Sequence, residues 1–225
     1  LRRESIMGDI FITGNTAIDA MRYTVRPDYK FSTAILNELD FAHHRVLAVT
    51  CHRRENYGEP MRNIMHAILR LVEENPDVEV VYPVHLSPVV RECAFPILGS
   101  HPRIHLIDPI DVEEMHNLMA RCFFVLTDSG GLQEEAPALG KPVLVMRRET
   151  ERPEAIAAGT AKLVGVEQET ILREANELLH SEAAYAKMAK AVNPYGDGHA
   201  SERIVQAILW HFGRTADRPG DFCAQ

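Results

Sequence analysis

Six short apolar segments, alternating with segments of helical spacing, are the feature of this sequence that most constrains its fold. The apolar segments are RVLAVT (45–50), VEVVYPV (78–84), RIHLI (103–107), FFVLT (123–127), PVLVM (142–146) and TAKLV (160–164). Each is hydrophobic almost without interruption, which is typical of a strand buried on both faces of a parallel sheet. The chain is therefore expected to form a doubly wound, parallel α/β sheet of the Rossmann-like type.

The segments between these strands carry helix signals. In the longest one, the apolar residues that recur at helical spacing are Met61, Ile64, Met65, Ile68, Leu71 and Val72. Pro76 marks its end, and a later segment, DVEEMHNLMARC, opens on an aspartate suited to cap a helix. A further helix is expected in LQEEAPAL, before Gly140, with others near 167–191 and at 199–212.

The first thirty residues differ from the rest. Residues 9–13 (DIFIT) predict a short strand and residues 16–24 a helix, and a polar stretch around Pro27 then suggests a linker. We expect residues 1–30 to be left over from a preceding domain, residues 31–213 to form the sheet domain, and residues 214–225 to be a mobile tail. Because the chain opens on LRRES and its first methionine is Met7, we expect it to begin part-way through a larger protein.

The composition narrows the class of function. Lys and Arg number 24 against 32 Asp and Glu, for a formal net charge of −8. A general nucleic-acid binder has a basic face and a high pI, so this acidic balance argues against that class of protein. No apolar run in the sequence reaches the ~18 residues of a membrane helix, and no signal-peptide pattern is found. The four cysteines are scattered, so we expect neither a metal site nor disulfides, and a cytoplasmic location.

Polar and basic residues follow five successive strands of the predicted sheet. They are His52, Arg53 and Arg54 after the first, His85 after the second, Asp108 after the third, Ser129, Gly130 and Gly131 after the fourth, and Arg147, Arg148 and Arg152 after the fifth. Ligands of open α/β sheets bind at the carboxyl ends of the strands. A ligand site is therefore expected along this edge; the alternative is that these loops are polar only because they lie at the surface.

The Ser129-Gly130-Gly131 turn is the sharpest local signal. Bare N–H groups in such a turn can face a ligand, and the start of the following helix favours an anion such as phosphate. The spacing fits neither a dinucleotide fingerprint nor a Walker loop. Glu135, one helical turn beyond Gly131, could accept both hydroxyls of a ribose. The alternatives are a merely tight turn and a solvated Glu135, and solvation is what we expect of Glu134.

Arginine and histidine side chains would complete such a site. The five loop arginines suit phosphate because the guanidinium fork matches its oxygens. One or more of them pairing with a nearby glutamate is the ordinary alternative, but we do not expect all five to do so. His52 and His85 could transfer protons or donate hydrogen bonds to phosphate, although a lone histidine is commonly structural. Histidines such as His43, His66 and His180 are expected to be surface or packing residues.

Six motifs resemble the signatures of the non-hydrolysing UDP-N-acetylglucosamine 2-epimerases, in the family's order. They are TGNTAIDA, CHRRENYG, PVHLSPVV, DSGGLQEEAPALGKPVLVMR, TERPEA and NPYGDGHASERI. The resemblance runs from about residue 3 to 212. Members of that family have two Rossmann-like domains in the glycosyltransferase-B arrangement, with the substrate between them. The resemblance therefore implies that 31–213 is the C-terminal, UDP-binding domain and that 1–30 is the end of the N-terminal one.

The resemblance also implies a reaction and a role for each residue. The family inverts C2 of UDP-GlcNAc to give UDP-ManNAc, by anti elimination of UDP and its re-addition to the opposite face. The residues implied to hold UDP are Ser129, Gly130 and Gly131 at the diphosphate, Glu135 at the ribose hydroxyls and Arg152 at a phosphate or nearby sugar group. His52 would be the catalytic histidine of the cleft. Arg53 and His85 match positions that touch a second, activating UDP-sugar in some bacterial members.

The sequence departs from the family pattern in two respects. Where the family usually has aromatic residues near the uracil, Pro109 is here followed by Val112 and Met115, which implies aliphatic or thioether contacts. The acidic residues used for proton abstraction at C2 belong to the N-terminal domain. We therefore expect this chain to bind UDP without a cofactor, and not to turn over UDP-GlcNAc alone.

The expected partners follow from the same resemblance. They are the N-terminal domain or an equivalent chain, and a second copy in a homodimer. Two other functions stay open: a non-catalytic module that binds UDP-sugars, and the donor domain of a glycosyltransferase-B-type glycosyltransferase.

Overall fold

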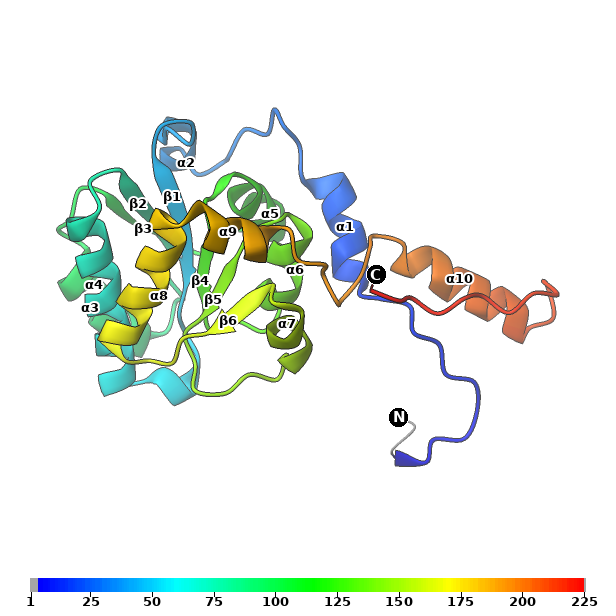
Figure 1. The fold of residues 1–225 in the computed structure, drawn as a ribbon. Helices are drawn as coiled ribbons and strands as arrows, with labels where there is room; N and C mark the ends of the chain where they lie inside the picture. Colours follow the sequence, from blue (N-terminus) through cyan, green and yellow to red (C-terminus); the bar gives the residue numbers. More distant parts are fainter. Residues whose placement is uncertain (1–3, 225) are drawn as a thin grey trace.

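The structure, a computed structural model that describes residues 4–224, is built on one parallel sheet (Figure 1). Within that range the sheet has six strands: β1 Arg45–Thr50, β2 Val78–Pro83, β3 Ile104–Ile107, β4 Val125–Thr127, β5 Val143–Val145 and β6 Ala161–Leu163. Their order, β3-β2-β1-β4-β5-β6, reverses between β1 and β4. The predicted doubly wound Rossmann-like sheet is confirmed, and its switch point lies where the candidate site residues follow β1 and β4.

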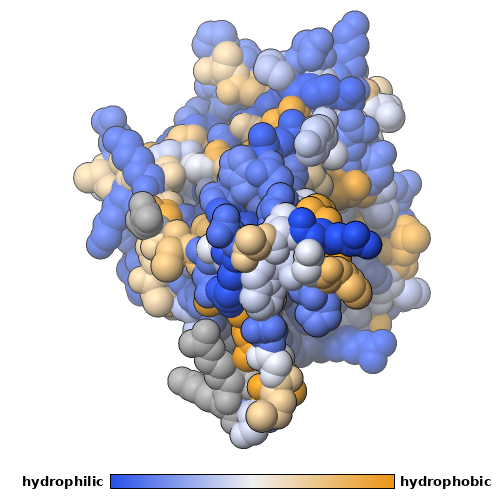
Figure 2. Space-filling model, turned by 90° about the vertical axis from the view of Figure 1, so that its right-hand side faces the viewer, coloured by the Kyte–Doolittle hydropathy of each residue, from blue (hydrophilic) through white to orange (hydrophobic). Residues whose placement is uncertain are grey.

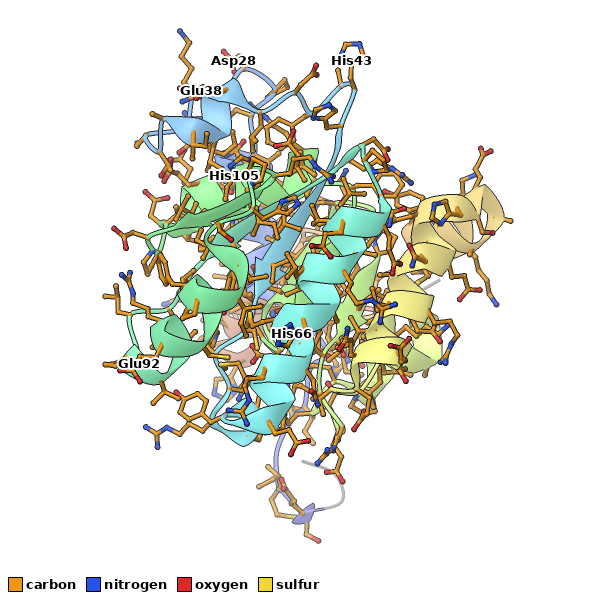
Figure 3. The ribbon with its side chains drawn as sticks, turned by 90° about the vertical axis from the view of Figure 1, so that its left-hand side faces the viewer. Asp28, Glu38, His43, His66, Glu92 and His105 are labelled. Atoms are coloured by element: carbon orange, nitrogen blue, oxygen red, sulfur yellow. The ribbon has the colours of Figure 1, made fainter. Side chains whose placement is uncertain are left out.

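Helices cover both faces of the sheet. They are α3 Glu59–Glu74, α4 Pro88–Leu98, α5 Val112–Arg121, α6 Leu132–Ala138, α7 Pro153–Ala158, α8 Gln168–His180 and α9 Glu182–Ala189, with the short α2 Ile35–Glu38 before β1. Figure 3 looks onto α3 and α4, which cover one face of the sheet, with His66 of α3 among the exposed side chains. The predicted aspartate cap is present, since the Asp111 side chain accepts the amide of Glu114 at 2.8 Å.

Alternating residues of the strands supply two separate cores. Leu47 and Val49 of β1 pack in one core with Ile64 of α3, whereas Val46 of the same strand packs in the other with Leu118 of α5. Both sets are buried. A strand covered on both faces needs apolar side chains at every position, and the uninterrupted apolar runs in the sequence have this cause.

Two further helices, α1 Thr16–Thr24 and α10 Ala200–His211, lie together beside the sheet (Figure 1). Asp19 of α1 is buried and accepts the amides of Ala200 at 3.0 Å and Ser201 at 2.6 Å, which satisfies two donors at the start of α10. The amide of Asn15 donates to the carbonyl of Tyr195 at 2.7 Å. The two terminal motifs of the sequence therefore meet in space and form one interlocked contact.

The strand predicted at residues 9–13 is wrong, because this segment forms no strand. A strand needs a neighbouring strand for its hydrogen bonds, and within residues 4–224 this segment lies instead beside helix α10, where the ring centroids of Phe11 and Trp210 are 5.8 Å apart, and beside the chain after Gly213. There the amide of Phe222 donates to the carbonyl of Ile12 at 2.6 Å, and Phe222 is buried. Residues 214–224 of the region expected to be a mobile tail thus form no helix or strand, but they contact residues 10–12.

No helix within residues 4–224 combines the length and the apolar character that crossing a membrane requires.

Candidate functional site

The residues that follow β1 and β2 line an open hollow. It has a volume of about 590 Å³, and its lining is His52, Arg53, Arg54, Glu55, Tyr57, His85 and Ser87. The rings of His52 and His85 stack with their centroids 5.2 Å apart and their planes at 25°. The structure thus brings together two histidines that lie at neighbouring strand ends in the sequence, as the parallel sheet predicts.

Asp128, at the end of β4, organises the loop after β1. It is fully buried, and its Oδ2 accepts the amides of His52 at 2.8 Å and Arg53 at 2.7 Å, together with the side-chain amide of Asn56 at 3.1 Å. Its Oδ1 has no hydrogen-bond partner among the described residues. One carboxylate therefore fixes the backbone from which His52 and Arg53 project.

Two guanidinium groups lie beside Gly130 of the Gly130-Gly131 turn. A Cβ added to Gly130 would stand 3.6 Å from Nη2 of Arg53 and 3.8 Å from Nη2 of Arg152. Within residues 4–224, the amides of Gly130 and Gly131 donate to no acceptor. Free N–H groups beside two arginines are chemically suited to hold an anion, more so than the turn or the arginines alone.

A chain of hydrogen bonds holds the turn in place. The Ser129 amide donates to Oγ1 of Thr127 at 2.9 Å, and the Ser129 carbonyl accepts from the Gln133 side chain at 3.1 Å. Gln133 in turn accepts from the Thr150 hydroxyl at 2.6 Å, and that hydroxyl accepts the Arg152 amide at 3.1 Å. The turn after β4 is thus linked to the loop after β5 that carries Arg152.

Glu134 is not the solvated carboxylate expected from the sequence. It is only 7% exposed, and it pairs with the guanidinium of Arg152 and accepts from the side chain of Asn15. The helix α6 buries this position because α1 and the loop after β5 both pack against it. Arg152 is therefore oriented by a buried partner beside the glycine turn, and hydrogen bonding to Glu134 raises the pKa of Arg152.

Glu135 lies one turn into α6, as predicted, and it is partly buried. One carboxylate oxygen, Oε1, is 3.6 Å from the position of a Cβ on Gly131. The other, Oε2, is 3.5 Å from Nε2 of His116, which comes from α5. His116 belongs to the histidines expected only to pack or face solvent, and nothing in its sequence neighbourhood signals this position.

The other loop arginines differ in how far their side chains are engaged. Arg147 is buried and forms ion pairs with Glu55 and Glu151. Arg148 is exposed and pairs with Glu167 at 3.3 Å. Of the five arginines, Arg53 lies beside Gly130 without a carboxylate partner, and the side chain of Arg54 has no hydrogen bond or ion pair within residues 4–224. The expectation that not all five would be paired internally is confirmed.

The Arg147–Glu151 pair predicts an acid-sensitive stability. Hydrogen bonding to Arg147 lowers the pKa of Glu151 from 4.5 to about 2. A depressed pKa stabilises the folded state above pH 4.5, and this stabilisation is lost as the pH falls from 4.5 towards 2. Urea unfolding at pH 7, 4 and 3 should therefore show a smaller loss on acidification in Glu151→Gln than in the wild type. Glu149→Gln, a control at an exposed position in the same loop, should lose as much stability on acidification as the wild type. An equal loss of unfolding free energy in all three proteins would contradict the prediction.

Cys51, which precedes His52, is not a nucleophile candidate. It is fully buried, and burial followed by the nearby charge of Asp128 raises the pKa of its thiol. The thiolate, which is the reactive form, is therefore disfavoured at neutral pH.

The residues expected near the uracil lie on the first turn of α5. Val112 is 65% exposed, and Met115 is partly buried against the core beneath α5. No aromatic side chain occupies either position.

Fold and site together define a doubly wound α/β domain with a candidate anion site at its topological switch point. The chain belongs to the UDP-N-acetylglucosamine 2-epimerase family, whose sequence model matches residues 1–209. The family resemblance read from the six motifs is confirmed.

Individual relatives agree with this assignment. The chain is 51% identical over 222 residues to the UDP-N-acetylglucosamine 2-epimerase of Bacillus subtilis (strain 168), covering 99% of this chain and 57% of that protein. It superposes on the S. aureus MnaA-UDP co-structure with a TM-score of 0.89 at 49% identity, over 95% of this chain and 57% of that one. The UDP-GlcNAc 2-epimerase from Neisseria meningitidis bound to UDP-GlcNAc gives a TM-score of 0.85 at 42% identity, over 93% and 58%. The chain thus spans somewhat more than half the length of these relatives.

A more distant likeness concerns the fold alone. The C-terminal domain of a group 1 glycosyl transferase (LpcC) from Francisella tularensis superposes with a TM-score of 0.57 at 13% identity. The sheet domain is therefore of the kind found in two-domain glycosyltransferases, as expected.

Proposed function

We propose that this chain binds UDP at the switch point of its sheet. Ser129, Gly130 and Gly131 hold the diphosphate, with Arg152 at a phosphate or the adjacent sugar, and Glu135 accepts the two ribose hydroxyls. The single observation that carries the proposal is the position of Gly130, whose amide has no acceptor among the described residues and which lies beside the guanidinium groups of Arg53 and Arg152. Two relatives of this chain were solved with UDP or UDP-GlcNAc bound, which supports the same ligand here.

The activity proposed for the whole protein is interconversion of UDP-GlcNAc and UDP-ManNAc. When UDP leaves C1, negative charge develops on the diphosphate, and preorganised amides and arginines stabilise that charge. Because UDP stays in the same site, it can re-add to the opposite face of the sugar at a high effective concentration. His52 is the residue proposed to act in the cleft, beside the departing diphosphate. Arg53 and His85 face the neighbouring hollow, where a second UDP-sugar would bind.

The proposed partner is an N-terminal domain that supplies the acidic groups for C2. Residues 1–30 are proposed as the end of that domain and its linker, 31–213 as the UDP-binding domain and 214–225 as a tail. The end of the molecule formed by α10 exposes Val205, Ile208 and Phe212, the last at 70%, and Figure 2 looks onto this end. Exposed apolar residues there suit contact with a further domain. A homodimer and a cytoplasmic location remain part of the proposal.

The proposal is tested by following UDP-GlcNAc by NMR with this chain alone and after addition of the separately expressed N-terminal half. We expect UDP to bind the chain alone, and UDP-ManNAc to appear only in the mixture. Absence of any heat or chemical-shift change on titration with UDP would refute the binding site.

The same samples separate the two alternative functions. Sugar transfer to an added acceptor would indicate a glycosyltransferase donor domain. Binding of UDP-GlcNAc with no epimer in the mixture would indicate a module that binds but does not catalyse.

A further inference from the structure

His116 is a buried histidine with one nitrogen unaccounted for. It is 2% exposed, and its Nδ1 lies 2.8 Å from the hydroxyl of Thr24. Its Nε2 is buried and has no hydrogen-bond partner among the described residues, yet Oε2 of Glu135 lies 3.5 Å away. A buried polar atom without a partner is costly, so its orientation towards Glu135 requires an explanation.

The chemistry of the contact determines which nitrogen carries a proton. If Nε2 carried no proton, its lone pair would face the negative Glu135 carboxylate. The two groups would then repel each other, and Nε2 would still lack a hydrogen bond. With a proton on Nε2, the 3.5 Å contact with Oε2 of Glu135 becomes attractive. Nδ1 can then accept from the Thr24 hydroxyl at 2.8 Å, a shorter contact than the 3.3 Å from that hydroxyl to the Ala20 carbonyl. Glu135 is then held at one oxygen, and its other oxygen lies over Gly131, on the side of the glycine turn.

His116 also connects Glu135 to the end of α1. Thr24 is the last residue of α1, and the next helical position after His116, Asn117, donates to the Thr24 carbonyl at 2.8 Å and accepts the Arg26 amide at 2.9 Å. At the other end of α1, the side chain of Asn15 donates to Glu134. One end of α1 therefore contacts a carboxylate of α6 directly, and the other end reaches the neighbouring carboxylate, Glu135, through His116 of α5.

We propose that His116 is a positioning residue that orients the Glu135 carboxylate for the ribose, and that this orientation depends on the seating of α1. The proposal rests on the ribose role of Glu135 in the proposed function. A carboxylate that must accept two hydroxyls needs a fixed plane, and a single buried donor on the opposite oxygen side supplies it. Ligands with ribose hydroxyls should therefore depend on His116, whereas ligands without them should not.

The test compares UDP with 2′,3′-dideoxy-UDP by calorimetry. In His116→Leu, we expect the Kd for UDP to rise about fivefold to tenfold, the effect of one net hydrogen bond, and the Kd for the dideoxy ligand to stay unchanged. His116→Gln, which keeps a donor near the same place, should restore most of the UDP affinity. Glu113→Gln is the matched control, since Glu113 lies on the same helix and pairs with Arg26 but does not face Glu135. Equal weakening of both ligands, or of neither, would overturn the proposal.

A second measurement needs no ligand. ¹H–¹⁵N NMR of the imidazoles should show a slowly exchanging Nε2–H signal of His116 that shifts in Glu135→Gln and not in Glu113→Gln. A signal that is absent, or indifferent to Glu135, would overturn the positioning role. If wild-type protein binds UDP and the dideoxy ligand equally while this signal behaves as expected, the ribose assignment of the proposed function fails and the His116–Glu135 contact stands.

Discussion

Replacement of Arg152 by alanine is expected to lower the affinity for UDP by about two orders of magnitude and to destabilise the fold. The first effect follows from losing a charge-assisted contact with the diphosphate, worth about 1.5–3 kcal/mol. The second arises because Glu134, 7% exposed, loses its cationic partner in a buried position. We expect that loss to be about 2 kcal/mol, below the range for a fully buried pair because Arg152 is one-third exposed. Calorimetry with UDP and urea unfolding measure the two quantities separately.

The double variant Arg152→Ala/Glu134→Gln separates these effects. Neutralising Glu134 removes the uncompensated buried charge, so the stability should return towards that of the wild type. The UDP affinity should stay low, because the guanidinium is still missing. Recovery of UDP affinity in the double variant would show that Arg152 acts only as a structural partner of Glu134.

Replacement of Asp128 by alanine is expected to destabilise the protein by about 3 kcal/mol or more and to weaken UDP binding. The substitution leaves three N–H groups without an acceptor: the amides of His52 and Arg53, and one N–H of the Asn56 side chain, whose other N–H donates to the Met146 carbonyl. Each buried donor left unsatisfied costs about 1–3 kcal/mol. The loop after β1 should shift, and with it the guanidinium of Arg53 beside Gly130.

Asp108→Ala provides the matched control for this prediction. Asp108 also follows a strand of the sheet, but its side chain is 84% exposed and pairs only with Arg91 among the described residues. Its loss should change the free energy of unfolding by no more than ~0.5 kcal/mol. Urea unfolding measures this free energy for Asp128→Ala and Asp108→Ala. Similar, small decreases in both variants would mean that the hydrogen bonds to Asp128 contribute little to stability.

The sheet was predictable because its central strands, β1, β2, β4 and β5, are buried on both faces, whereas the edge strands β3 and β6 are only partly buried. The apolar runs from 45–50 to 160–164 each contain a strand of the structure, some trimmed by a residue or two at the ends. Residues 9–13 have the same local pattern without forming a strand. Their sequence shows β-propensity, but propensity becomes a strand only when another strand supplies hydrogen bonds.

The site was predictable in outline and not in its supporting contacts. The strand ends identified His52, His85 and the glycine turn, since a parallel sheet places all carboxyl ends at one edge. The burial of Glu134 and the position of His116 depend on helices that pack against α6 from distant parts of the chain. Asp128 was visible as a residue after β4, but its role requires that β4 lie beside β1, an adjacency that no local pattern contains.

A backbone hydrogen bond joins the loop before α1 to the loop before α10, and this pairing bears on how the domain can be exchanged between related proteins. The chain enters the unit formed by α1 and the sheet at Asn15 and leaves it at Tyr195, before α10, and the amide of Asn15 donates to the carbonyl of Tyr195 at this junction. A unit that is entered and left at one place can be exchanged as a cassette, because its host must accommodate only a single paired junction. Swapping the sheet unit between relatives, with the junction kept intact, should yield folded chimaeras.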